Sequence, residues 1–275
     1  MNVSQPDLHL PPEWRDALAR AGACRRVLVL GATDMGKTSF IRAFLDRAGG
    51  EARLIDLDPG QKMIGPPGTV ARGRSGRVER FVFIGTTSAS ALSAIAWAAR
   101  ALAEGAEPFI VNTSGFVKGI GARLQAMTVA AIEPDLIVEL GSEPIATGTR
   151  VPIVRLERSP LARRKSPAVR AALRQAAFDR ELEGASTLAI EAAAFEPGPL
   201  APWESPARPV CSLADTNGND LALGIVHGAE GETLTVYTRA PTAEVRLVRL
   251  GKMWAEPKEG GWRLLERLSP SWIQP

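Results

Sequence analysis

A chain of 275 residues is long enough to bury a large α/β core with a smaller additional unit. Its 45% hydrophobic and 23% charged residues are typical of a globular protein, and no stretch approaches the roughly 18 consecutive apolar residues of a membrane span. The net charge of +3 suits a polyanionic partner, and the first residues lack the basic and apolar regions of a secretion signal, so we expect a cytoplasmic protein without membrane contact.

The few cysteines and histidines exclude two further classes of site. Cys24 and Cys211 lie far apart and outside any metal-ligand spacing, which predicts incidental thiols in a reducing compartment. His9 and His227 are the only histidines, so a histidine-based triad or zinc centre is not expected.

The first predicted element is a short helix that begins at Pro12, because proline is favoured at the first helical position, and that runs to about Gly22. Strands are then expected at 27–30, 53–57, 81–84, 109–112, 136–140 and 153–156. Helices are expected at 37–47, 88–103, 119–132 and 167–183. Short strands rich in valine, isoleucine and leucine that alternate with helices predict an α/β fold, a mostly parallel sheet with helices on both faces.

Two segments break this alternation. The glycine-rich, basic segment 65–77 predicts a loop or a hairpin. After the proline-rich stretch 196–203, strands are expected at 221–226, 234–237 and 245–250, with turns at Asn217-Gly218 and Glu230-Gly231. They predict a small antiparallel β-rich module at the C-terminal end.

The segment Gly-Ala-Thr-Asp-Met-Gly-Lys-Thr at 31–38 matches the pattern G-x-x-x-x-G-K-[ST] between a buried strand and a helix. This order predicts a P-loop NTPase-type sheet. Gly31 and Gly36 let the backbone curl around phosphate oxygens, Lys37 reaches the β- and γ-phosphates, and Thr38 completes a Mg²⁺ shell. The candidate nucleotide-binding residues are Gly31, Thr33, Asp34, Met35, Gly36, Lys37, Thr38 and Ser39. The cofactors implied are ATP and Mg²⁺.

Two aspartates follow the second strand, in the run Asp-Leu-Asp-Pro-Gly-Gln at 56–61. Strand alternation predicts that Asp56 and Asp58 share one side, at the carboxyl end of a parallel sheet where ligands bind. With Thr38 they are the candidate metal ligands, while one carboxylate accepts a proton from an attacking hydroxyl and Gln61 positions a phosphate or water. The alternative is an acidic turn, since Asp-Pro-Gly is common turn chemistry.

Four segments together resemble a known family. They are the loop 31–38, the run 56–61 with Gly-Pro-Pro-Gly-Thr at 65–69, Phe-Ile-Gly-Thr-Thr-Ser at 83–88, and Asn-Thr-Ser-Gly-Phe-Val-Lys-Gly at 112–119. Their order and spacing are similar to the polynucleotide 5′-hydroxyl kinases that include the eukaryotic mRNA 3′-end cleavage-complex kinase and the ribosomal-RNA-processing kinase. The resemblance covers roughly residues 12–182 and implies a compact form without the N-terminal domain of the larger members.

The resemblance implies a role for each segment. Lys37 and Thr38 hold phosphates and Mg²⁺, Asp58 activates the nucleic-acid 5′-hydroxyl, and 112–119 lines the acceptor side, with Phe116 where the family usually has tryptophan. The implied substrate-binding residues are Gln61, Thr86, Thr87, Asn112, Thr113, Gly115, Phe116 and Lys118. The implied partner is a nucleic acid with a 5′-hydroxyl end, RNA ahead of DNA, and protein partners are left open.

An arginine-rich segment at 158–182 resembles the family's lid over the phosphoryl donor. Its candidate catalytic residues, beside Lys37 and Asp58, are Arg163, Arg164 and Arg170, since a planar guanidinium grips phosphate oxygens and neutralises charge as the γ-phosphoryl moves. The alternative is a solvated basic helix. Further basic residues in and just after the segment 65–77 are also expected to contact phosphates: Arg72, Arg74, Arg77 and Arg80.

The sequence therefore predicts three parts: a lead-in helix at 1–24, a polynucleotide kinase domain at 25–200 with its lid near 158–182, and a β-rich module at 201–275. The predicted activity is transfer of the γ-phosphate of ATP to the 5′-hydroxyl of RNA or DNA. Two alternatives stay open: a nucleotide-dependent switch or assembly scaffold without kinase activity, and a kinase for a small-molecule hydroxyl.

Overall fold

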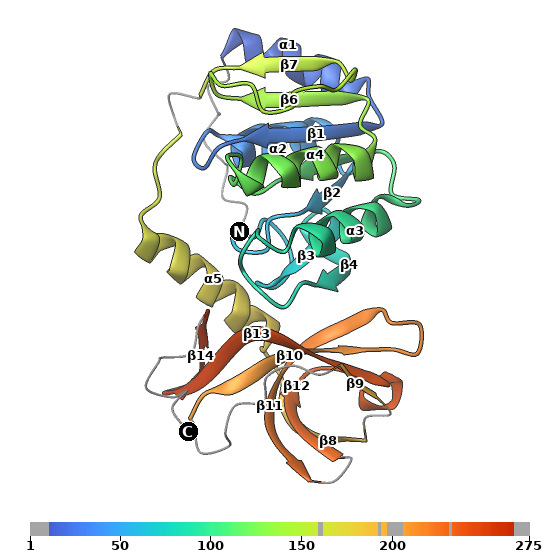
Figure 1. Ribbon diagram of the computed structural model, residues 1–275, viewed down its shortest axis with the longest axis vertical. Coiled ribbons are helices and arrows are strands. Elements are labelled where there is room, and N and C mark those ends of the chain that lie inside the picture. Colours follow the sequence, from blue (N-terminus) through green and yellow to red (C-terminus); the bar gives the residue numbers. More distant parts are fainter. Residues whose placement is uncertain (1–10, 159–161, 192–193, 197–205, 231–232, 267–275) are drawn as a thin grey trace.

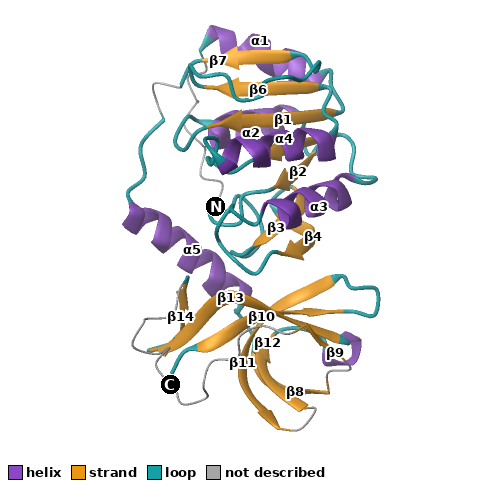
Figure 2. Ribbon diagram, in the orientation of Figure 1, coloured by secondary structure: helices purple, strands orange, loops and turns teal. Residues whose placement is uncertain are grey.

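The computed structural model describes residues 11–158, 162–191, 194–196, 206–230 and 233–266 (Figure 1). The expected lead-in residues 1–10, the proline-rich stretch 197–203 and Gly231 of the expected turn lie outside these residues. Two sheets dominate the described part, and they are stacked end to end along the long axis of the molecule with a helix between them (Figure 2).

The first sheet has seven strands. They are β1 (Arg26–Gly31), β2 (Arg53–Asp56), β3 (Thr69–Arg74), β4 (Arg77–Phe83), β5 (Phe109–Asn112), β6 (Leu136–Leu140) and β7 (Ile153–Leu156). Their order is β4-β3-β2-β5-β1-β6-β7, in which β3 is antiparallel to both neighbours and the other pairs are parallel. The basic segment 65–77 thus forms one arm and the turn of an antiparallel hairpin at the edge of the sheet.

Helices cover both faces of this sheet. Helices α1 (Pro12–Gly22) and α2 (Lys37–Arg47) pack on one face, while α3 (Leu92–Ala103) and α4 (Ile120–Ile132) pack on the other. Strand β1 is buried almost throughout because both of its faces are covered, which is why its sequence is a continuous apolar run. The predicted α/β class, with a mostly parallel sheet between helical layers, is confirmed.

The second sheet is antiparallel apart from one short strand. Its members are β8 (Ser186–Glu191), β9 (Ala194–Glu196), β10 (Arg208–Ala214), β11 (Asp220–Glu230), β12 (Thr233–Thr238), β13 (Leu247–Lys258) and β14 (Gly261–Leu265), with a 3₁₀ turn at Thr242–Glu244. The main order is β14-β13-β10-β11-β12-β8, and β9 pairs in parallel with β13. Because β8 pairs with β12, this sheet begins before residue 200, so the expected boundary between 200 and 201 falls inside it.

Helix α5 (Pro167–Glu181) lies between the two sheets (Figure 1). Ser166 caps it, since its hydroxyl accepts a hydrogen bond from the backbone N–H of Val169 at 3.2 Å, and Pro167 occupies the first helical position. Phe178 anchors the helix by complete burial in the core that the two sheets share. No helix in the described ranges is long and apolar enough to cross a membrane.

The two sheets also meet directly through the edge hairpin of the first. The backbone N–H of Phe83 donates to Asp220 Oδ2 at 2.8 Å, and the N–H of Lys252 donates to the carbonyl of Gly85 at 2.6 Å. Met253 of β13 is almost completely buried in the shared core. The second sheet is therefore packed onto the first rather than tethered to it by a linker alone.

Candidate functional site

The loop between β1 and α2 has the shape of an anion cradle. Gly36 stands at the start of α2 with φ of 104°, a left-handed conformation that favours glycine, and no side chain caps this helix end in the described contacts. The first N–H groups of α2 are thus left to point into the loop with the positive end of the helix dipole. Lys37 folds back over the loop, and its Nζ donates to the carbonyls of Gly31 at 2.6 Å and Ala32 at 3.0 Å.

The loop opens into a cavity of about 510 Å³ between α2, the loops after β2 and β5, and the lid segment. Fourteen of the residues expected in the site line it: Thr33, Asp34, Met35, Gly36, Lys37, Thr38, Ser39, Asp58, Gln61, Asn112, Thr113, Gly115, Arg163 and Arg170. The lining holds eight lysines and arginines but only two aspartates, so the space is strongly cationic. Such a cavity suits a ligand with several negative charges.

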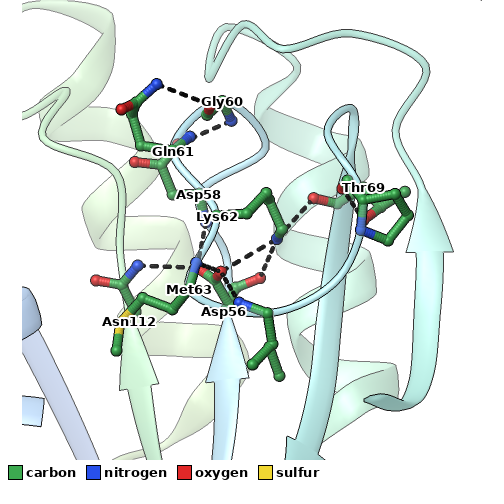
Figure 3. A network of polar contacts seen from close by, with 10 residues as sticks. Asp56, Asp58, Gly60, Gln61, Lys62, Met63, Thr69 and Asn112 are labelled. Carbon is green, nitrogen blue, oxygen red and sulfur yellow. Dashed lines mark hydrogen bonds and ion pairs between the residues drawn. The ribbon is translucent and has the colours of Figure 1, made fainter. Parts of the chain in front are cut away.

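The two aspartates after β2 have different surroundings (Figure 3). Strand β2 ends at Asp56, whose carboxylate is fully buried and accepts hydrogen bonds from Asn112 Nδ2 at 2.8 Å and the backbone N–H of Met63 at 2.6 Å. Asp58 lies beyond the strand, half-buried, and faces the cavity; its Oδ1 accepts from the N–H groups of Gly60 and Gln61, each at 2.9 Å.

The expectation that both aspartates share one side of a strand is therefore wrong, because the chain leaves the strand after Asp56. Protein donors already occupy both oxygens of Asp56, so a metal ion would have to displace them. The geometry leaves Asp58 as the carboxylate that is available to a ligand, while Asp56 organises the loop that carries it.

Lys62 completes this network, although no sequence motif marks it. Its side chain is 3% exposed, its Nζ lies 3.3 Å from Asp56 Oδ2, and it donates to the carbonyl of Thr69 at 3.1 Å. The lysine thereby compensates the buried carboxylate and ties the Asp58 loop to β3. A lysine six residues after an aspartate at a strand end gives no sequence signal of its own.

Arg42 is a second lining residue that the motifs did not reveal, although helical spacing would have found it. It lies four residues after Thr38 on α2, one turn further along the same face. Lys62, Lys165, Arg174 and Arg180 also line the cavity without having been named as site residues.

The segment after β5 closes the cavity beside the phosphate loop. A Cβ added to Gly115 would lie 2.2 Å from Thr33 Oγ1 and 2.6 Å from Thr33 N, so only glycine allows this approach. Thr113 Oγ1 donates to the carbonyl of Val29 at 2.8 Å and fixes the segment to β1. The motif at 112–119 thus shapes the wall of the loop in addition to facing the cavity.

The lid segment is held against the phosphate loop by Asp34. Arg170 Nη2 lies 2.7 Å from Asp34 Oδ2, and the backbone N–H of Lys165 donates to the same oxygen at 3.2 Å. Gln61 Nε2 also lies 3.4 Å from the carbonyl of Arg170. Asp34 has a φ of 62°, an uncommon value for a residue with a side chain, and it aims its carboxylate at the lid.

Several expected site residues lie outside the lining that the described residues form. Arg164 is exposed on the lid, Phe116 is 39% exposed, and Lys118 pairs with Glu143 at 2.9 Å on the surface. Gly31 also lies outside the lining, and its carbonyl accepts a hydrogen bond from Lys37 Nζ. Thr86 and Thr87 also lie outside the lining. The carbonyl of Thr87 closely approaches Gly60 of the Asp58 loop, and Thr86 Oγ1 accepts from the N–H of Ser88 at 3.1 Å.

The four arginines expected to contact phosphates do not line the cavity either. Arg72, Arg74, Arg77 and Arg80 lie on β3 and β4 at the edge of the first sheet. Glu79 lies 3.5 Å from Arg72 Nε and 4.0 Å from Arg74 Nε, and Arg72 Nη1 donates to carbonyls at the end of α3. The hairpin carries them away from the carboxyl ends of the parallel strands, where the cavity opens.

Burial perturbs the two central titratable groups in opposite directions. Burial lowers the pKa of Lys37 to about 8, with the positive charge of Arg170 acting in the same sense and Asp58 and Asp34 opposing it. Burial and the neighbouring Asp56 carboxylate raise the pKa of Asp58, against the N–H groups of Gly60 and Gln61 and the charge of Lys62. A lysine and a carboxylate with shifted pKa values in one cavity are typical of a functional site.

The residues fit a nucleoside triphosphate with a magnesium ion. The uncapped helix end, the left-handed Gly36 and Lys37 form a polyphosphate cradle. Within the described residues no group of three or more histidine, cysteine, aspartate or glutamate side chains could enclose a metal by itself. Magnesium fits nevertheless, because it is usually held by one or two side chains together with substrate phosphates, and oxygen-bearing side chains such as Thr38 and Asp58 line the cavity.

A glycine loop between a buried parallel strand and a helix, opening into a cationic cavity, defines a P-loop nucleotide-binding protein. Residues 31–181 match the family model described as mRNA cleavage and polyadenylation factor CLP1 P-loop, and the chain belongs to this family. The resemblance noted in the sequence is thereby confirmed.

Single curated proteins resemble this chain at modest sequence identity and over only part of its length. A polyribonucleotide 5′-hydroxyl-kinase of Pyrococcus furiosus is 25% identical over 60% of this chain and 52% of its own length, and one of Pyrococcus horikoshii is 30% identical over 57% and 49%. The chain therefore spans about half the length of these curated relatives. Among solved structures, Clp1p in the wild-type Clp1p–Pcf11p complex has a TM-score of 0.64 at 12% identity, with 82% of this chain and 73% of that chain covered.

Proposed function

We propose that this protein is an ATP-dependent polynucleotide 5′-hydroxyl kinase, with RNA as the preferred acceptor over DNA. The observation that carries the proposal is one cationic cavity shared by the phosphate loop, the Asp58 carboxylate and the lid arginines. Family membership and the names of the polyribonucleotide kinases that it resembles support the choice of acceptor.

On the donor side, the triphosphate of ATP lies along the loop 31–38, and Lys37 leaves the carbonyls of Gly31 and Ala32 to engage its terminal phosphates. With Asp58 serving as the base, magnesium would be held by Thr38 and the phosphate oxygens and would supply charge neutralisation across the phosphates. Arg170 and Arg163 add positive charge from the lid as negative charge spreads over the moving γ-phosphoryl.

On the acceptor side, Asp58 accepts the proton of the attacking 5′-hydroxyl. Its two backbone hydrogen bonds fix the direction of one oxygen, and burial makes it a stronger base than an exposed aspartate. Asn112 and Gly115 form the wall along which the nucleic acid enters, with Phe116 at the exposed end available for base stacking. Catalysis in this proposal is alignment and electrostatics, without a covalent intermediate.

We propose a division of the chain that follows the sheets. The kinase unit extends through the lid helix α5, with α1 as its lead-in helix, and the C-terminal module begins at β8 instead of after residue 200. The cytoplasmic location expected from the sequence is part of this proposal.

The test is transfer of labelled γ-phosphate from ATP to 5′-hydroxyl RNA and DNA oligonucleotides by the full chain and by three variants. Lys37→Ala removes the phosphate contact. Asp58→Asn keeps an oxygen for the N–H groups of Gly60 and Gln61, so it removes the base without removing the loop contacts. Asp46→Asn, an exposed change at the far end of α2, is the matched control and should leave transfer unchanged.

We expect transfer by the wild type and the control, and a loss of about 10³-fold in both site variants. Intact ATP binding without transfer to any oligonucleotide would overturn the kinase proposal in favour of a nucleotide-dependent switch or scaffold. Transfer to a nucleoside but to no oligonucleotide would indicate a small-molecule kinase. Full transfer by Asp58→Asn would remove only the role assigned to this residue.

A further inference from the structure

The lid helix α5 makes an unusual polar contact with the second sheet through Gln175. Its Nε2 donates to the carbonyl of Trp262 at 2.8 Å, and its Oε1 accepts from the N–H of Leu264 at 2.9 Å. These two groups belong to β14, the outermost strand of the sheet order. A carboxamide offers the same donor and acceptor pair as a peptide group, so Gln175 pairs with the strand edge much as one residue of a further strand would.

Two ion pairs flank this contact on the same helix. Arg174 Nη2 lies 2.5 Å from Glu266 Oε1 just after β14, and Lys258 Nζ of β13 lies 3.5 Å from Asp179 Oδ1. Gln175 Nε2 also donates to Asp179 Oδ1 at 2.7 Å, one helical turn away. These contacts fix which residues of α5 lie against this edge of the second sheet, and we call this alignment the register of the lid helix.

The same stretch of helix faces the cavity. Arg174 lines it together with Ala176, Ala177 and Arg180, and its side chain is only 19% exposed. Because Arg174 directly precedes Gln175, a shift of Gln175 against β14 would also shift Arg174 in the wall of the cavity. One turn earlier, Arg170 is held by Asp34 of the phosphate loop.

We propose that Gln175 is a positioning residue, through which β14 of the C-terminal module holds the lid helix in the register that presents Arg174 and Arg170 to the phosphoryl donor. This inference rests on the proposed kinase function and assigns the C-terminal module a part in it. Gln175 does not touch the reacting atoms; it acts through the helix.

The experiment compares the full chain with Gln175→Ala, Gln175→Glu and the control Glu183→Gln, an exposed change just after α5. Hydrogen exchange of the α5 and α2 amides is measured with and without ATP, beside ATP affinity and the kcat and KM of transfer. In Gln175→Ala we expect α5 to exchange about tenfold faster, with α2 unchanged. The kcat should fall about tenfold or more, while ATP affinity stays within about threefold.

Gln175→Glu adds a readout that a purely structural role would not move. Ionised, the new side chain can accept from Leu264 but cannot donate to Trp262, and it repels Asp179; protonated, it can donate again. The ratio of its kcat to that of the wild type should therefore rise as the pH falls.

Two results would overturn the proposal: unchanged α5 exchange in Gln175→Ala, or faster exchange with an unchanged kcat. If the wild type transfers phosphate to no oligonucleotide, the kinase function fails separately. The proposed register of the lid is then judged by hydrogen exchange alone. ATP should protect the α5 amides in the wild type and protect them less in Gln175→Ala. Equal protection in the two proteins would reject the register.

Discussion

The phosphate loop and the lid helix face the same cavity but depend on very different contacts. The loop is built locally: Lys37 bonds to carbonyls five and six residues earlier, and Gly36 supplies the left-handed turn. The lid depends on distant partners, because Arg170 pairs with Asp34 and Gln175 pairs with β14. The donor cradle is therefore a property of one short segment, whereas the charge above it is placed by the rest of the molecule.

The largest effect is expected where a distant segment touches the local cradle. Gly115→Ala places a methyl group within 2.7 Å of backbone atoms of Thr33, so the loop must shift. We expect the free energy of unfolding to fall by about 1–3 kcal/mol and nucleotide affinity to fall by about a hundredfold. Chemical denaturation and nucleotide titration measure both.

The control for this change is Gly22→Ala, because a Cβ at Gly22 meets nothing within 4 Å. Wild-type nucleotide affinity in Gly115→Ala would show that the cradle does not depend on the segment after β5. The phosphate loop would then be even more independent of distant contacts than the structure indicates.

The second test addresses the cradle itself through pH. The pKa of Lys37 is about 8 in the free protein, and contact with phosphate raises it, so binding above pH 8 requires uptake of a proton. Nucleotide affinity should be independent of this group below pH 8 and fall by about tenfold per pH unit above it. Calorimetry in buffers of different ionisation enthalpy measures the uptake.

Lys37→Arg is the control for the pH effect, since arginine keeps its charge throughout this range. The nucleotide affinity of this variant should be lower than that of the wild type, but residue 37 should cause no change in it between pH 8 and 10. A wild-type affinity that is equally flat would contradict the lowered pKa of Lys37.

The third test breaks the link between loop and lid. Asp34→Asn, Arg170→Gln and the double variant form a cycle whose coupling energy should be about 1–2 kcal/mol, as expected for a partly buried charged hydrogen bond. The measured quantity is the free energy of opening of α5 from native-state hydrogen exchange. Additive effects of the two changes would mean that the ion pair between Asp34 and Arg170 does not hold the lid.

The smallest effect separates two adjacent arginines of the lid. Arg163 lines the cavity and Arg164 does not, although both were expected to act on the phosphoryl group. Because Arg163 is exposed at the cavity, Arg163→Gln should slow transfer of the γ-phosphate by about threefold, with little change in Arg164→Gln. The rate of transfer of labelled phosphate measures both. Equal losses in both variants would mean that the whole basic segment acts as a diffuse charge.

The short-range features of the site were predictable because each is written in neighbouring residues. The pattern 31–38 between a strand and a helix indicated the cradle, and helix 37–47 was predicted with the bounds of α2. Strands with only apolar residues indicated a sheet covered on both faces. The edge hairpin remained ambiguous and β8, β9, β10 and β14 were missed, since strand pairing between distant segments leaves weak local signals.

By itself the sequence determined the phosphate loop, the family and the α/β class, since these depend on contiguous residue types and their periodicity. Only the tertiary structure separated Asp58, which faces the cavity, from Asp56, whose carboxylate is used by Asn112 and Lys62. It alone assigned Arg163 and Arg170 to the cavity and joined the lid to β14. The physical reason is that burial and hydrogen-bond partners are set by segments far apart in the chain, and they decide what an otherwise equivalent charged residue can do.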